Sequence, residues 1–202
     1  MLLDNLTVID FETSGLRPDA DRVIEISAIR CYRGEVVSSF TTLVQFPGAL
    51  SPKITELTGI TGEQLAGGMD EGTAFRILNR MIGDNLIVAH NASFDLSFLH
   101  HTLVRLAGRS FRNSFLDTLT VCRQRHVYPH TLKDMCAKYG ISLDNHHRAQ
   151  ADVIATFELL KKLNEEQSVE AEINKLGFIR KYGPPKWVPQ HASIEAVDLK
   201  YA

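Results

Sequence analysis

The sequence predicts one α/β domain built around a mixed sheet. Three strand-like segments come first, and short apolar strands then alternate with segments of helical periodicity. Residues 23–32 and 35–44 are joined across Arg33-Gly34, which is typical of an antiparallel hairpin. This order of elements indicates a sheet with both strand directions, covered by helices on its faces.

The first elements are marked by strand composition and by helix caps. Residues 6–11 form an apolar run with β-branched side chains, as in a buried central strand. Ser51 followed by Pro52 indicates the start of a short helix that extends to about residue 57. Thr61 and Gln64 have the spacing of a capping box.

The middle of the chain alternates between helix and strand. A helical pattern begins at Asp70 and continues to about Ile82, and residues 86–89 form a short apolar strand. Helical spacing then resumes and ends at Gly108. The apolar residues that carry this second spacing are Phe94, Phe98, Leu99, Leu103 and Leu106.

Three further elements are expected before the character of the chain changes. Residues 115–116 fit a short fifth strand, and Thr131 is expected to cap a helix that ends at Gly140. A long last helix is expected over residues 149–163.

Residues 165–202 form a tail of different composition. Residues 165–176 are acidic and could extend a helix, whereas residues 183–189 contain three prolines and are expected to be stiff and extended. This second segment also holds Trp187, the only tryptophan. The tail could pack on the domain or dock onto a partner.

The composition limits the class of protein. The 202 residues are 44% hydrophobic and 23% charged, which suits a soluble globular domain. No apolar run approaches the length of a membrane span, and the N-terminus lacks the basic region of a secretory signal. The three cysteines are scattered, which argues against a disulfide framework or a zinc site and favours a reducing compartment, with the cytoplasm as the expected location.

The charge distribution neither requires nor excludes a nucleic-acid partner. The net charge is −2, so there is no global basic surface. Residues 104–133 are locally basic, with Asp117 as the one acid among six basic side chains. The six are Arg105, Arg109, Arg112, Arg123, Arg125 and Lys133. This segment could be a solvated surface or the flank of a strand-binding site.

Four acids on separate elements are candidates for metal binding. Asp10 and Glu12 lie two residues apart on the first strand, so they project from the same face, and their desolvation there would be unfavourable without a partner. Asp95 and Asp152 each lie near a helix start, where an acid could equally complement the helix dipole. Carboxylate oxygens suit Mg²⁺ or Mn²⁺, and two such ions about 4 Å apart hydrolyse phosphodiesters in many enzymes.

His147 lies five residues before Asp152, in a polar segment. A lone loop histidine is usually a surface residue. A neutral histidine, with an unperturbed pKa of about 6.5, could however accept the proton of an attacking water near neutral pH.

Taken together, three segments resemble the motifs of the DEDD exonuclease superfamily in its histidine form. Val8-Ile-Asp-Phe-Glu-Thr-Ser-Gly15 is similar to the first motif and Val88-Ala-His-Asn-Ala-Ser-Phe-Asp95 to the second. His147-Arg-Ala-Gln-Ala-Asp152 fits the third, H-x-A-x-x-D. The similarity is strongest to the DnaQ-like proofreading exonucleases, which include the epsilon subunit of bacterial DNA polymerase III and the exonuclease domain of the Gram-positive replicative polymerase.

This resemblance covers about residues 6–163 and implies a ribonuclease H-like fold with a five-stranded mixed sheet flanked by helices. Residues 1–164 would then be the exonuclease domain. The resemblance also implies that two Mg²⁺ or Mn²⁺ ions are bound by four carboxylates, with Asp10 bridging both ions and Asp95 acting partly through water. The catalytic residues would be Glu12 and His147, the latter as general base. The metal ligands would be Asp10, Glu12, Asp95 and Asp152.

The resemblance further suggests which residues hold the substrate. Thr13 would contact the terminal nucleotide, and the segment of Leu57 and Thr58 resembles the one whose apolar side chain wedges between the last bases. His90 and Asn91 would line the pocket. Each also has a structural interpretation, as a core leucine, a buried histidine or a plain N-cap asparagine.

The implied activity is 3′–5′ removal of nucleotides from the single-stranded or frayed 3′ end of DNA, in proofreading or repair. A DNA polymerase subunit is a possible partner, and no membrane association is expected. One alternative is an exoribonuclease that trims RNA or oligoribonucleotides. Another is a non-catalytic scaffold that binds a nucleic acid or a polymerase.

Overall fold

The structure is a computed structural model that describes residues 4–143 and 149–200. Five strands form one sheet in the order β3-β2-β1-β4-β5. The strands β1, β2 and β3 are antiparallel neighbours, whereas β4 and β5 run parallel to β1. Their bounds are β1 Asn5–Thr13, β2 Val23–Tyr32, β3 Glu35–Leu43, β4 Leu86–Ala89 and β5 Phe115–Asp117. The predicted mixed five-stranded sheet is confirmed.

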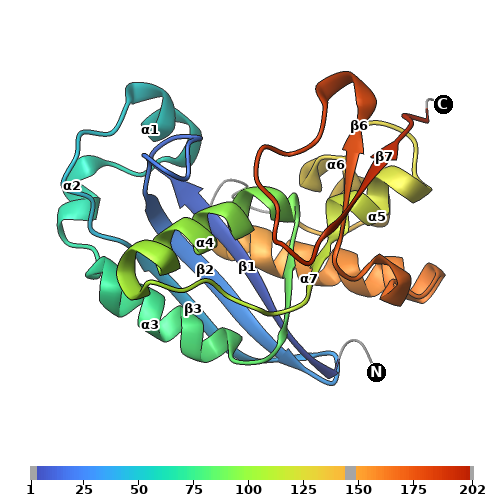
Figure 1. Cartoon of the computed structure of the whole chain (residues 1–202), viewed down its shortest axis with the longest axis horizontal. Helices are drawn as coiled ribbons and strands as arrows, with labels where there is room; N and C mark the ends of the chain where they lie inside the picture. Colours follow the sequence, from blue (N-terminus) through green and yellow to red (C-terminus); the bar gives the residue numbers. More distant parts are fainter. Residues whose placement is uncertain (1–3, 144–148, 201–202) are drawn as a thin grey trace.

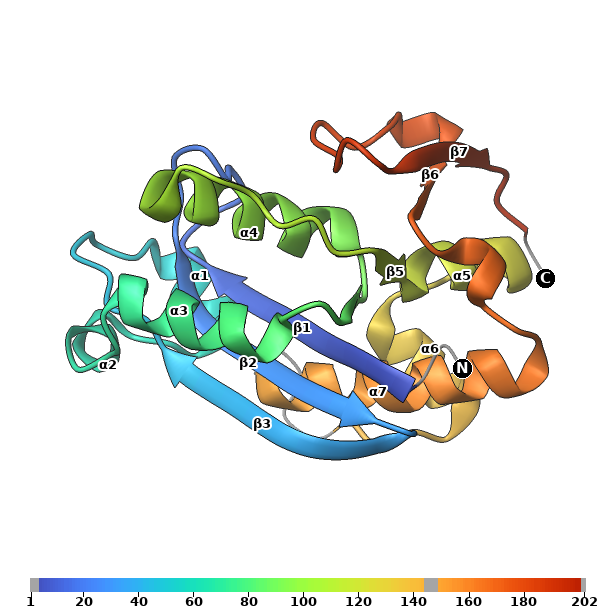
Figure 2. The same cartoon turned by 60° about the horizontal axis from the view of Figure 1, so that its bottom comes forward.

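Helices cover both faces of this sheet (Figure 1). In Figure 2, α3 (Glu71–Ile82) and α4 (Ala92–Ala107) lie on one face, and α6 (Leu132–Tyr139) and α7 (Ala149–Glu166) lie on the other. The short helices α1 (Pro52–Thr58) and α2 (Gly62–Ala66) follow β3. Among the described residues, no helix is both long enough and apolar enough to span a bilayer.

Side chains that point alternately to the two faces of β1 contribute to two separate hydrophobic cores. Leu6 and Val8 belong to the core that contains the residues of α6 and α7, whereas Ile9 and Phe11 belong to the core beneath α3 and α4. Because side chains alternate along a strand, Asp10 and Glu12 share the face of Val8, toward α7. The predicted orientation of these two acids follows directly from the pleat of the strand.

Side-chain caps start four helices, three of them at the predicted caps Ser51, Thr61 and Thr131 and one at Asp70, where a helical pattern was predicted to begin. Ser51, Asp70 and Thr131 each accept a hydrogen bond from a backbone N–H in the first turn of the following helix. Thr61 and Gln64 form both bonds of the predicted capping box. These side chains saturate amides that the helix itself cannot satisfy, which explains why the starts were predictable.

One helix was not predicted. The helix α5 (Thr118–Arg125) directly follows β5, and its N-cap is Asp117, whose carboxylate accepts from the N–H groups of Leu119 and Thr120. The apolar residues of α5 lack the spacing of one helical face, since Val121 and Cys122 are adjacent and both are buried. A helix that is buried on more than one side does not show an amphipathic pattern.

The last helix extends into the tail only as far as Glu166, and residues 175–176 of the segment that could have extended it belong to a strand. The helix α7 ends at Glu166, and β6 (Lys175–Ile179) pairs with β7 (Ser193–Val197) in a second, parallel sheet of two strands. Two 3-10 turns, η2 (Glu170–Glu172) and η3 (Arg180–Tyr182), flank β6. The indole of Trp187 lies against the ring of His100 on α4, with 4.8 Å between centroids. The tail therefore packs on the rest of the chain.

Candidate active site

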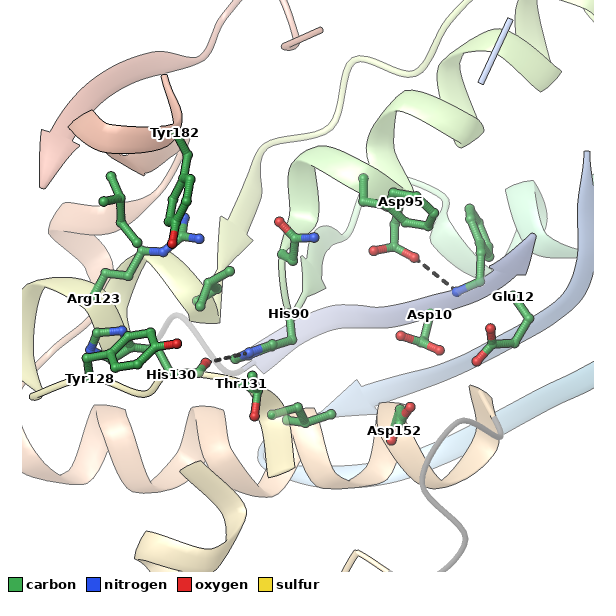
Figure 3. A pocket seen from close by; sticks show the side chains of 16 residues that line it. Asp10, Glu12, His90, Asp95, Arg123, Tyr128, His130, Thr131, Asp152 and Tyr182 are labelled. Carbon is green, nitrogen blue, oxygen red and sulfur yellow. Dashed lines mark hydrogen bonds between the residues drawn. The ribbon is translucent and has the colours of Figure 1, made fainter. Parts of the chain in front are cut away.

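Three carboxylates from two elements converge at one point of the sheet. One oxygen each of Asp10, Glu12 and Asp152 lies within 4.8 Å of the others. The first two side chains come from β1, and the third comes from α7, which packs on the same face (Figure 3). The cluster forms because α7 packs against β1 on the face from which Asp10 and Glu12 both project.

Asp95 reaches the same strand from the other side. Its Oδ1 accepts a hydrogen bond of 2.9 Å from the backbone N–H of Phe11, the residue between the two acids of β1 (Figure 3). Asp95 is buried in the first turn of α4 and is not part of the cluster of three. The structure therefore brings all four predicted carboxylates to one region, with Asp95 separately anchored.

The carboxylates repel one another in a buried environment. Burial raises the pKa of Asp10 well above its usual value, and the negative charges of Asp95, Asp152, Glu12 and Glu25 raise it further. Burial also raises the pKa of Asp95 to about 8, although the N–H groups of Phe11 and of Asp95 itself oppose the shift. A bound cation would remove this repulsion, and a donor set made only of carboxylate oxygens fits a hard divalent ion.

Sequence analysis did not single out Glu25. This buried residue of β2 lies directly opposite Glu12 in the antiparallel register. The signal was available, because Glu25 interrupts the apolar run of residues 23–26 just as Asp10 and Glu12 interrupt their own strand. Applying the same desolvation argument to the second strand would have identified it.

A cavity of about 560 Å³ extends away from the carboxylates. Asp10, Glu12 and Asp152 line one end, and Arg123, Tyr128 and Tyr182 line the other, with His90 between them (Figure 3). The cavity is thus acidic at one end and aromatic and basic at the other.

His90 is held by groups of the protein itself. Its Nε2 lies 3.1 Å from the carbonyl oxygen of His130, and its Nδ1 lies 2.9 Å from the hydroxyl of Thr118. Burial lowers the pKa of His90, which favours the neutral ring. A neutral ring donates through Nε2 to the carbonyl and accepts at Nδ1. Its predicted contact with substrate stays a prediction.

Asn91 is not a plain N-cap. Its backbone is left-handed, with a φ of 70°, and its side chain makes no capping hydrogen bond to α4. The cap is supplied by Asp117, whose Oδ1 accepts from the N–H groups of Asn91 and Ala92 at 2.9 and 3.0 Å. Asp117, a buried residue that sequence analysis treated only as a charge in a basic segment, therefore positions the start of the helix that carries Asp95.

The other predicted substrate residues lie outside the lining of this cavity. The hydroxyl of Thr13 donates to the carbonyl of Gly15, and that of Thr58 donates to the carbonyl of Ile54. Both hydroxyls therefore have hydrogen-bond acceptors within the protein. Leu57 is half exposed on α1. His147 lies outside the described residues. The roles of these four residues stay predictions.

Comparison with known proteins identifies the family. The model of a family described as "Exonuclease" matches residues 7–160. The chain is 37% identical over 174 residues to a PolC-type DNA polymerase III of Clostridium perfringens and 34% identical over 206 residues to that of Bacillus subtilis. These matches cover 82% and 96% of the chain but only 12% and 14% of the polymerases.

Solved structures share the fold. Exonuclease I of E. coli in complex with a dT13 oligonucleotide superposes with a TM-score of 0.74 and 23% identity, over 81% of this chain and 42% of that one. This likeness confirms the expected ribonuclease H-like architecture. The family match covers the positions of all four predicted carboxylates, from Asp10 to Asp152. The chain therefore belongs to the exonuclease family, as a DnaQ-like member of the DEDD superfamily of 3′–5′ exonucleases.

Proposed function

We propose that this protein removes nucleotides from the 3′ end of DNA, at single-stranded or frayed ends. The observation that carries the proposal is the carboxylate cluster at the end of an open cavity, in a chain of the exonuclease family. The relatives of 34–37% identity are DNA polymerases, which favours DNA over RNA and a role in proofreading or repair. A DNA polymerase is accordingly the proposed partner.

The four predicted carboxylates would hold the metal. Asp10, Glu12 and Asp152 would be direct ligands, and Asp95 would complete the site from the opposite side of β1. When bound, two Mg²⁺ or Mn²⁺ ions would supply charge stabilisation for the attacking water and the leaving 3′ oxygen. The protein's own contribution is to fix these oxygens on a strand and two helices, so that little rearrangement is needed during the reaction.

His147 is the proposed proton acceptor. Replacing it with alanine should lower kcat by roughly two to four orders of magnitude, the usual contribution of a positioned acid–base group. His146→Ala is the matched control, because His146 lacks the motif's spacing to Asp152. Release of labelled nucleotide from single-stranded DNA measures both variants. An unchanged rate for His147→Ala would assign the proton to another group.

A degradation ladder tests the function itself. DNA and RNA labelled at the 5′ end, single- and double-stranded, would be incubated with Mg²⁺ or with chelator. We expect stepwise shortening of single-stranded DNA that requires the metal. Faster shortening of RNA would support the exoribonuclease alternative. Absence of shortening together with absence of Mn²⁺ binding in calorimetry would support a non-catalytic scaffold.

A further inference from the structure

We propose that Arg123, Tyr128 and Tyr182 form a binding subsite for the nucleotides that lie 5′ of the scissile phosphodiester. This inference rests on the proposed function and deepens it. It assigns a substrate to the end of the cavity that is remote from the carboxylates. It also assigns a role to residues 175–182, which lie beyond the region matched by the family model.

The shape of the cavity indicates where a strand would run. The carboxylate cluster fixes the position of the reacting phosphate, and the cavity continues from there past His90 to the two tyrosines (Figure 3). The 3′-terminal nucleotide fits in a single enclosed subsite, whereas the rest of the strand needs an open path out of the protein. The end lined by exposed side chains is therefore the exit, and the strand that leaves through it is the 5′ portion.

The two tyrosines have the chemistry of a base-stacking surface. Their exposed fractions are 52% for Tyr128 and 70% for Tyr182, although both rings border a cavity. Exposed aromatic rings beside a basic side chain are typical of sites that bind single strands without sequence preference. Stacking tolerates every base, as an exonuclease acting on arbitrary ends requires.

Arg123 supplies the positive charge at this end. Within the described part of the chain it forms no ion pair, whereas Arg105, of the same basic segment, is bound by both oxygens of Glu71. Arg125 donates to three backbone carbonyls, those of Leu163, Gln167 and Ser168, whereas Arg123 donates to one, that of Gly177. Of these three arginines, Arg123 alone lines the cavity, so its charge is available to a phosphate of the strand.

The tail is fitted to this wall of the cavity. The N–H of Gly177 donates to the hydroxyl of Thr120 at 2.8 Å, and Arg123 donates to the carbonyl of Gly177 at 2.7 Å. A Cβ at position 177 would lie 2.9 Å from the side chain of Val197 on β7 and 3.1 Å from that of Thr120 on α5, so glycine lets β6 pack closely against both elements. These contacts place Ile179 and Tyr182 on the cavity.

The test compares binding of long and short oligonucleotides. Tyr128→Ala combined with Tyr182→Ala should weaken binding of a twelve-nucleotide oligothymidylate roughly 5-fold or more for each ring removed. Binding of a dinucleotide, which is too short to reach both rings, should weaken far less. Fluorescence anisotropy in Ca²⁺ measures both affinities in the full chain.

Tyr32→Ala is the matched control, since Tyr32 is also an exposed tyrosine, at 43%, but pairs with Asn5 at the opposite end of β1. It should bind both oligonucleotides as the wild type does. In addition, Arg123→Gln should reduce the slope of log affinity against log salt by about 0.7, the value for one phosphate contact on a single strand. Arg123→Lys should restore the slope.

The outcomes separate this inference from the proposed function. A wild-type protein that shortens no nucleic acid contradicts the proposed function. If the wild type is active and the double-tyrosine variant binds the long oligonucleotide as tightly as the wild type does, the subsite is overturned. An equal loss for dinucleotide and dodecanucleotide also overturns it, because the rings would then contact the terminal nucleotides.

Discussion

Asp10→Asn should abolish measurable nucleotide release and leave the protein folded. Asp10 is the acid on which the charges of Glu12, Asp95 and Asp152 all act, so it lies at the centre of the proposed metal site. Asparagine keeps the shape of the side chain but removes one negative charge. Charge stabilisation by bound metal contributes several kcal/mol to such a transition state, so the loss in kcat should be roughly 10³-fold or more.

The same substitution should raise stability in chelator. The folded protein raises the pKa of Asp10, so at neutral pH its ionised form opposes folding, and the neutral amide removes that penalty. Mn²⁺ at about 100 times its Kd should stabilise the wild type by about 2.7 kcal/mol and the variant far less. Thermal unfolding with and without Mn²⁺ measures this difference.

Asp84→Asn is the control for both measurements. Asp84 is an exposed acid in the turn between α3 and β4, so its substitution removes the same charge away from the cluster. It should retain wild-type release and the stabilisation by Mn²⁺. Wild-type release by Asp10→Asn would show that the reaction does not depend on the cluster.

Those parts of the fold that local chemistry determines were predictable from the sequence. The caps at Ser51, Thr61 and Thr131 satisfy amides within one turn, so a few neighbouring residues contain the whole signal. The orientation of Asp10 and Glu12 follows from the pleat of a single strand. These features need no knowledge of distant residues.

Features that depend on long-range contacts were not predictable in this way. Asp117 caps α5, which directly follows it, but only the fold also places it beside the first turn of α4, 25 residues away along the chain. Likewise, β6 and β7 pair with each other across an intervening segment of the tail. They are attached to β5 through Asn174, whose backbone N–H donates to the carbonyl of Phe115. Each of these strands has only five residues, which is too short for a clear alternating pattern, and its stabilising contacts come from distant segments.

Asp117→Ala should cause the largest loss of stability. The carboxylate accepts five hydrogen bonds, four from backbone N–H groups and one of 2.6 Å from the hydroxyl of Thr120. Alanine would leave these buried donors without an acceptor, at a cost of about 1–3 kcal/mol for each. The summed effect, on the order of 5 kcal/mol, is comparable with the whole unfolding free energy of a small domain. The midpoint of urea unfolding measures it.

Asp117→Asn separates the positioning role of this residue from loss of the fold. The amide keeps one acceptor oxygen for Asn91 and Ala92, but its NH₂ group would face the N–H of Thr120, donor against donor. We expect a smaller loss, about 2 kcal/mol, and a folded protein. Because α4 carries Asp95, displacement of its first turn should weaken Mn²⁺ binding in this folded variant. Wild-type Mn²⁺ affinity in calorimetry would show that Asp95 keeps its place without a carboxylate at position 117.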